Sequence, residues 1–188
     1  MAIDTMPERS VRLYTPWALI EGALACPARM RTLDELNVTT EFLSVRRPVT
    51  LRRSWEVAEE NLAIHKSSIL FVHECGPSPP LDGGDFGRFA RASVRLKIDD
   101  FTVHGFVHVP PGGSPLKRFE NQRHPFVALT SALIAGDQIE VVVPFLAVNR
   151  LRVAAIQELR ASTRAADSED ATDPAADAPR PVLLRDPG

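Results

Sequence analysis

The sequence predicts a mainly β fold: two tandem five-stranded β-barrels, each with a short helix, followed by a disordered C-terminal tail. Three observations support this prediction. The second part of the chain repeats the pattern of the first, its apolar residues alternate over short runs, and its sixteen prolines argue against long helices. With 188 residues, of which 44% are hydrophobic, the chain is long enough for two small domains that each bury a core.

The repeat is co-linear and needs a single insertion. One constant offset places residues 11–13 on residues 94–96 and residues 20–24 on residues 103–107. One extra residue in the second copy then shifts the alignment, so that residues 62–66 fall on residues 146–150. Because chance matches would not stay in order along the chain, the pattern indicates an internal duplication.

Each copy begins with a short strand and a longer strand that carries a central glycine. The first strands are expected at residues 11–14 and 94–97, and the second strands at residues 19–26 and 102–109. Gly22 and Gly105 fall at the same place on the inward face of the second strand. A glycine there indicates a sharp bend of the kind that closes a small barrel.

A short helix is expected after the second strand, and three further strands complete each copy. In the first copy the helix begins with a capping box at residues 32–35, and in the second copy Ser114 precedes a proline at the first helical position. The remaining strands are expected at residues 41–45, 55–57 and 68–74 in the first copy, and at residues 125–129, 139–143 and 151–157 in the second.

The domain boundaries follow from the repeat and from local composition. The first barrel is predicted at residues 9–75 and the second at residues 92–160, with a linker rich in glycine and proline at residues 76–91. Residues 161–188 are rich in Ala, Asp, Ser and Pro. Such a composition buries too little apolar surface to offset the cost of ordering, so this tail is expected to be disordered.

Charge and targeting signals exclude several classes of protein. The formal net charge of −2 is not that of a strong nucleic-acid binder, whose domain would be plainly basic. No basic segment leads into an apolar run at the N-terminus, so no signal peptide is expected, and no apolar run is long enough to span a membrane. Cys26 and Cys75 are interpreted as reduced thiols, which favours a cytoplasmic location.

The end of each copy carries a recognisable pattern. At residues 64–72 and 148–153, an apolar residue is followed by two polar or basic turn residues, and a second apolar residue five positions after the first leads into the final strand. This pattern, together with the second strand and its glycine, resembles that of Sm-like proteins, although SH3-like barrels give much the same pattern. A proline followed by a Leu-Asp-x-Leu-Asn element, at Pro27 and residues 33–37, is also similar to uncharacterised bacterial proteins. Sm-like proteins generally bind RNA as rings, so the resemblance implies RNA or ligand contacts at His65, Lys66, Asn149 and Arg150.

A cluster of arginines surrounds residues 48–51. One interpretation is a contact for phosphate or for an acidic partner. The alternative is a solvated hairpin whose charged residues guard an edge against aggregation. The residues concerned are Arg46, Arg47, Arg52 and Arg53.

No catalytic, cofactor-binding or metal-binding motif is evident. His104 and His108 lie about 13 Å apart if they are on one strand, which is too far for them to share a metal ion. His73 and Cys75 lack a second pair of ligands at suitable spacing. No nucleophile stands with a base and an acid at corresponding places in the two copies, and no small-molecule substrate is indicated.

The sequence therefore predicts a non-catalytic protein-interaction or scaffold module built from a duplicated small β domain. Exposed strand edges on such domains can bind a protein partner or a second copy by strand addition. The alternative is an RNA-binding Sm-like protein. Neither hypothesis involves a cofactor or a membrane.

Overall fold

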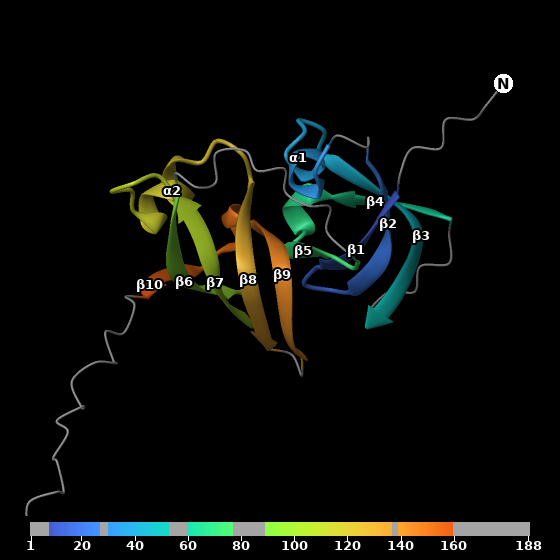
Figure 1. Cartoon of the computed structure of the whole chain (residues 1–188). Coiled ribbons are helices and arrows are strands. Elements are labelled where there is room, and N and C mark those ends of the chain that lie inside the picture. Colours follow the sequence, from blue (N-terminus) through green and yellow to red (C-terminus); the bar gives the residue numbers. More distant parts are fainter. Residues whose placement is uncertain (1–7, 27–29, 53–59, 77–88, 137–138, 160–188) are drawn as a thin grey trace, which may run out of the picture.

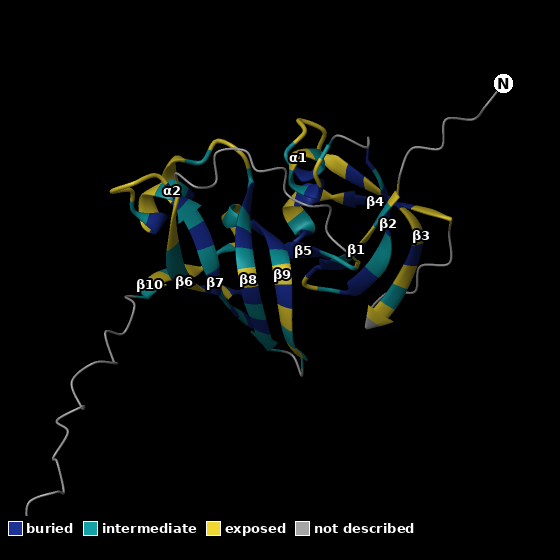
Figure 2. Cartoon of the chain, in the orientation of Figure 1, coloured by how far each residue is buried: buried dark blue, intermediate teal, exposed yellow. Residues whose placement is uncertain are grey.

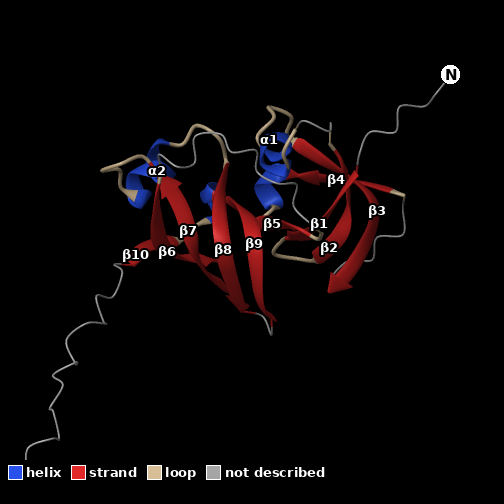
Figure 3. Ribbon diagram, in the orientation of Figure 1, coloured by secondary structure: helices blue, strands red, loops and turns tan. Residues whose placement is uncertain are grey.

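The computed structural model describes residues 8–26, 30–52, 60–76, 89–136 and 139–159. The prediction of a mainly β protein is confirmed, since the described residues form ten strands in one antiparallel sheet, with two short helices (Figures 1 and 3). Residues 8–76 are called the first half below, and residues 89–159 the second half.

The elements follow one another in the same order in both halves. The first half contains β1 (Glu8–Tyr14), β2 (Leu19–Ala25), α1 (Thr32–Leu36), β3 (Phe42–Arg52), β4 (Asn61–His65), the 3-10 turn η1 (Lys66–Ser68) and β5 (Phe71–Glu74). The second half contains β6 (Ala90–Ile98), β7 (Phe101–Val109), α2 (Pro115–Asn121), β8 (Phe126–Gly136), β9 (Ile139–Asn149), the 3-10 turn η3 (Arg150–Arg152) and β10 (Ala155–Leu159).

The ten strands form an open sheet in the order β10-β6-β7-β8-β9-β5-β1-β2-β3-β4. Within each half, the fifth strand of the chain lies at one side in the sheet, and the first, second, third and fourth strands lie beside it in that order. The two halves therefore have the same strand order. They join where β9 pairs with β5, which places Val148 opposite Phe71 and Ala147 opposite Val72. The prediction of two separate five-stranded barrels is not confirmed. Within the described residues the sheet is not closed, and the free edge of β5 is taken by a strand of the other half.

The central glycines mark irregularities in the sheet. The pairing of β2 with β3 shifts register around Gly22, and that of β7 with β8 shifts around Gly105. A Cβ on Gly22 would lie 2.4 Å from Cγ1 of Val45, whereas one on Gly105 would meet Cβ of Ala132 at 3.3 Å. Glycine therefore allows a close approach of β3 to β2 in the first half, and a less severe one in the second half.

The cores of the two halves interpenetrate. Tyr14, Leu70 and Phe71 of the first half pack in the cluster that otherwise belongs mainly to the second half. Phe126 and Ala147 of the second half pack in the cluster of the first half. Figure 2 shows buried residues continuing across the junction between β9 and β5. The halves therefore form one body, because each supplies side chains to the core of the other.

Some element boundaries differ from those predicted. The third strands continue beyond residues 45 and 129, because β3 and β8 each pair with two different neighbours along their length. The final strands begin later than predicted, because η1 and η3 take up residues after the fourth strand. The strand expected at residues 55–57 lies outside the described residues, as do most of the linker and the tail at 161–188. Where the structure is described, no helix is long and apolar enough to cross a membrane.

Candidate interaction surface

Asn149, at the end of β9, ties the second half to the first. Its side-chain amide donates to the carbonyl oxygens of Ile69 at 2.9 Å and Lys66 at 3.2 Å. Its side-chain oxygen accepts a hydrogen bond from the backbone N–H of Leu151 at 3.1 Å. The residue is only 1% exposed. Asn149 was predicted as a ligand contact, and the structure places it inside the junction between the halves.

Lys66 is also buried, at the start of η1. Its ammonium donates to the carbonyl oxygens of Glu35 at 3.1 Å and Val38 at 2.9 Å, and to Oγ1 of Thr40 at 3.3 Å. Three acceptors match the three protons of the ammonium group. The positive charge therefore stabilises the C-terminal end of α1, while burial lowers the pKa of the group.

His65 and Arg150, the other two residues of the predicted contact, are more accessible. His65 is the exposed residue that ends β4, and its Nδ1 accepts a hydrogen bond from the backbone N–H of Ser67 at 3.2 Å. Arg150 donates from Nε to the carbonyl oxygen of His124 at 3.1 Å. The predicted set is therefore divided, because Lys66 and Asn149 are occupied inside the protein while His65 and Arg150 lie at the surface.

The sheet ends in two edges that are unpaired within the described residues, β4 and β10. Natural sheets usually guard such edges with proline, lysine or a bulge. β4 reads Asn-Leu-Ala-Ile-His and β10 reads Ala-Ile-Gln-Glu-Leu, so neither contains proline or lysine. An exposed apolar side chain lies near each edge, Phe42 (54% exposed) beside β4 and Leu151 (64% exposed) before β10.

The position of Phe42 contrasts with that of Phe126, which the predicted repeat aligns with it. Phe126 is 0% exposed, because it lies at the junction of the halves. Its backbone N–H and carbonyl bond to the side chain of Asn37 at 3.0 and 3.1 Å. The role of Asn37 was missed by sequence reasoning. No local sequence signal indicates this contact, because the two residues are 89 apart in the chain.

The predicted arginine cluster is only partly brought together. Arg46 and Arg47 both pair with Glu8 of β1, and the hydrogen bond from Arg47 is the main cause that lowers the pKa of Glu8. Arg47 and Glu8 also line a shallow depression of about 330 Å³ together with Glu21. Arg52 ends β3, and Arg53 lies outside the described residues. Glu8 therefore offsets one of the two positive charges of Arg46 and Arg47 within the protein.

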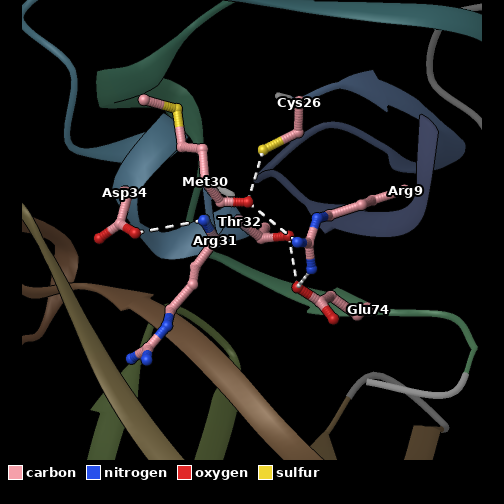
Figure 4. Close-up of polar contacts among 7 residues, drawn as sticks. All are labelled: Arg9, Cys26, Met30, Arg31, Thr32, Asp34 and Glu74. Atoms are coloured by element: carbon pink, nitrogen blue, oxygen red, sulfur yellow. Dashed lines mark hydrogen bonds and ion pairs between the residues drawn. The ribbon is translucent and has the colours of Figure 1, made fainter. Parts of the chain in front are cut away.

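A second polar cluster, not predicted from the sequence, connects β1 and β5 to Cys26 after β2 and to Met30 and Thr32 at the start of α1 (Figure 4). Arg9 donates to the carbonyl oxygen of Met30 at 2.9 Å and pairs with Glu74 of β5. The hydroxyl of Thr32 also bonds to Glu74, and the thiol of Cys26 donates to Met30 at 3.1 Å. Burial raises the pKa of Cys26. The cluster is therefore structural, since its thiol is inaccessible and poorly ionised.

The histidines do not form a metal site. His104 bonds to Arg95 of the neighbouring strand, and His108 bonds to Thr130. His73 is 5% exposed, and burial lowers its pKa to about 4. In the part of the chain that the structure describes, no three His, Cys, Asp or Glu residues are grouped so as to hold a metal ion.

No protein-family model matches the chain, and no curated protein or solved structure is significantly similar to it.

Proposed function

We propose that the chain is a non-catalytic protein-interaction or scaffold module, built from a duplicated small β domain, that binds polypeptide at the free edges of its sheet. The single observation that supports this proposal most directly is the open sheet, with an unpaired strand at each end of the described fold. An unpaired strand presents a row of backbone donors and acceptors, which an extended segment of another chain can satisfy.

The composition of the edges favours polypeptide as the ligand. β4 has a buried inner face, formed by Leu62 and Ile64, and an outer face without lysine or arginine. The exposed ring of Phe42 stands edge-on to the ring of His65 at 5.0 Å, beside the unpaired strand. An added strand would gain backbone hydrogen bonds from β4 and apolar contact from this ring.

RNA binding is the alternative, and its support is weaker. The ammonium of Lys66 is bonded to three oxygens of the protein, so it has no proton left for a phosphate. Arg46 and Arg47 are paired with Glu8. Of the contacts implied by the resemblance, His65 and Arg150 are the ones at the surface.

The test is site-specific photo-crosslinking of the full chain in the cells that express it. The photoreactive residue p-benzoylphenylalanine replaces Phe42, beside the β4 edge. The matched control places it at Val142, which is 71% exposed but lies on β9 within the sheet. We expect a covalent polypeptide adduct at position 42 that is several-fold stronger than at position 142. Mass spectrometry then identifies the adduct.

A proline on the edge strand completes the experiment. Ala63→Pro removes one outward backbone donor of β4, so it should abolish the adduct at position 42. Equal adducts at positions 42 and 142, or none at either, would overturn the proposal. Fluorescence anisotropy with single-stranded RNA tests the alternative. If the chain binds RNA in a salt-sensitive way and Arg150→Ala removes this binding, the chain is an RNA-binding protein and the proposed interaction module is wrong.

A further inference from the structure

We propose that the polypeptide bound at the β4 edge is the β10 edge of a second copy of this chain, so that chains join head to tail by repeating the junction that β9 and β5 form within each chain. This inference rests on the proposed function and names its partner. β9 is the fourth strand of its half and β5 is the fifth strand of the other half. β4 and β10, the two free edges, are likewise a fourth and a fifth strand.

The free edges have the backbone conformation of the occupied ones. At the start of the fifth strands, Leu70 donates to the carbonyl of Tyr14 at 2.7 Å and Ala154 donates to that of Lys97 at 2.8 Å. At the end of the fourth strands, Lys66 donates to Glu41 and Arg150 donates to Pro125, both at 2.8 Å. β4 and β10 are therefore already shaped as the two sides of the internal junction.

The backbone of His65 is free to repeat the contact made by Asn149. Within the chain, the N–H of Asn149 donates to the carbonyl of Leu70 at 3.0 Å. Successive N–H groups along a strand point in opposite directions. The backbone N–H of Lys66 donates towards β3, to the carbonyl of Glu41. The N–H of His65 therefore points the other way, towards the free side of β4. The corresponding acceptor is the carbonyl of Ala154 in the second copy, because Ala154 aligns with Leu70 in the repeat.

The side chain of His65 matches that of Asn149 as well. Nδ1 of His65 and Oδ1 of Asn149 each accept from the backbone N–H two residues later, at 3.2 and 3.1 Å. When Nδ1 accepts, the neutral ring carries its proton on Nε2. That single proton can replace one of the two donations that the Asn149 amide makes across the internal junction, to the carbonyls of Lys66 and Ile69. The corresponding acceptors in the second copy are the carbonyls of Arg150 and Val153, of which His65 would use one.

The same pairing between chains would cover the exposed ring of Phe42. Phe126 occupies the matching place in the second half and is fully buried by contact with the first half. Asn37 at the end of α1 binds the backbone of Phe126. Asn121, the last residue of α2, is exposed and lies 84 residues after Asn37, the same offset as between Phe42 and Phe126, so it would hold Phe42 of the next chain.

The internal junction also sets the register between chains. Val148 opposite Phe71 becomes Ile64 opposite Ala155, and Ala147 opposite Val72 becomes Ala63 opposite Ile156. The two surfaces in contact are different, so the interface is heterologous. Such an interface closes into a ring if the rotation between copies allows it, and otherwise extends into a filament.

The register is tested by disulfide formation between two separately purified full-length variants, Ala63→Cys and Ile156→Cys, which are mixed and mildly oxidised. Residues directly opposite on antiparallel strands have Cα atoms about 4.5 to 5.5 Å apart, which suits a disulfide. The matched control replaces Ile156→Cys with Gln157→Cys, whose side chain lies on the other face of the sheet. We expect a 63–156 cross-link at least about tenfold more abundant than the 63–157 cross-link. Peptide mapping distinguishes it from links to Cys26 or Cys75.

The assembly itself is measured by sedimentation velocity over a range of concentrations. We expect the unmodified chain to form species larger than one chain, Ala63→Pro to weaken association at least about tenfold, and Ala63→Gly, which keeps the N–H and adds no atoms, to associate normally. A circular dichroism melt of each variant establishes that it is folded. A chain that stays single at every concentration, or links formed equally at 156 and 157, would overturn this inference. In that case, capture of a different protein at position 42 would still support the proposed function, although the inference of self-association would be wrong.

Discussion

Replacing Asn149 by alanine should weaken the junction between the two halves of the sheet and so lower the stability of the whole chain. The substitution removes three side-chain hydrogen bonds, two of which cross from β9 to the first half. It also leaves the buried carbonyl of Ile69 without this partner. Each such bond contributes about 0.5–1.5 kcal/mol, and a buried group left unpaired costs about 1–3 kcal/mol. We therefore expect Asn149→Ala to lower the free energy of unfolding by about 3 kcal/mol.

His65→Ala is the matched control, because His65 occupies the equivalent position at the free edge. Its side chain is exposed and bonds only locally, to the N–H and the hydroxyl of Ser67. The expected loss is below about 1 kcal/mol. Urea unfolding followed by circular dichroism gives both values, at a chain concentration low enough that self-association does not contribute.

An equal loss of stability in Asn149→Ala and His65→Ala would refute this reasoning. That result would mean that the side-chain contacts of Asn149 add nothing to the backbone pairing of β9 with β5. A decrease in the denaturant midpoint without a change in the urea dependence is the expected form of the result, because the two halves should still unfold together.

Four further substitutions test other parts of the fold. Gly22→Ala should cost about 2 kcal/mol in thermal unfolding because its Cβ would meet Val45, whereas Gly105→Ala should change stability by less than about 1 kcal/mol. Lys66→Met should cost about 2 kcal/mol by removing three hydrogen bonds, and an unchanged melting temperature would contradict the role given to the ammonium. His73 has a pKa lowered from 6.5 to about 4 by burial, so its contribution is complete above pH 6.5 and is lost as the pH falls towards 4. Between pH 7 and pH 4 the unmodified chain should lose about 3 kcal/mol more than His73→Gln in urea unfolding, and parallel pH profiles would refute this.

The individual strands could be predicted from the sequence because alternation of apolar residues is a local signal. β7 alternates buried and half-buried residues throughout its length, and it was expected at residues 102–109. The pairing of β9 with β5 could not be predicted in this way. Its register depends on contacts between residues far apart in the chain, such as Ala147 and Val72, and nothing in either strand alone specifies that partner.

The candidate site was predictable only as a place in the repeat. The turn residues were found because the same short pattern occurs twice, but the pattern does not distinguish a buried copy from an exposed one. Asn149 is buried because β5 lies against it, and His65 is exposed because no strand of the described chain pairs with the outer edge of β4. The partners of Asn149 are 80 and 83 residues away, so its role depends on the tertiary structure.

The shared cores have a consequence for synthesis on the ribosome. The first half emerges first, but its core contains Phe126 and Ala147, which are made much later. Until those residues leave the exit tunnel, β5 has no strand on its outer side and the pocket for Phe126 is empty. The nascent first half therefore stays incomplete through most of translation. Folding should finish in one late step. The segment between β5 and β9, which contains β6, β7, α2 and β8, must first bring these two strands together before either core is filled.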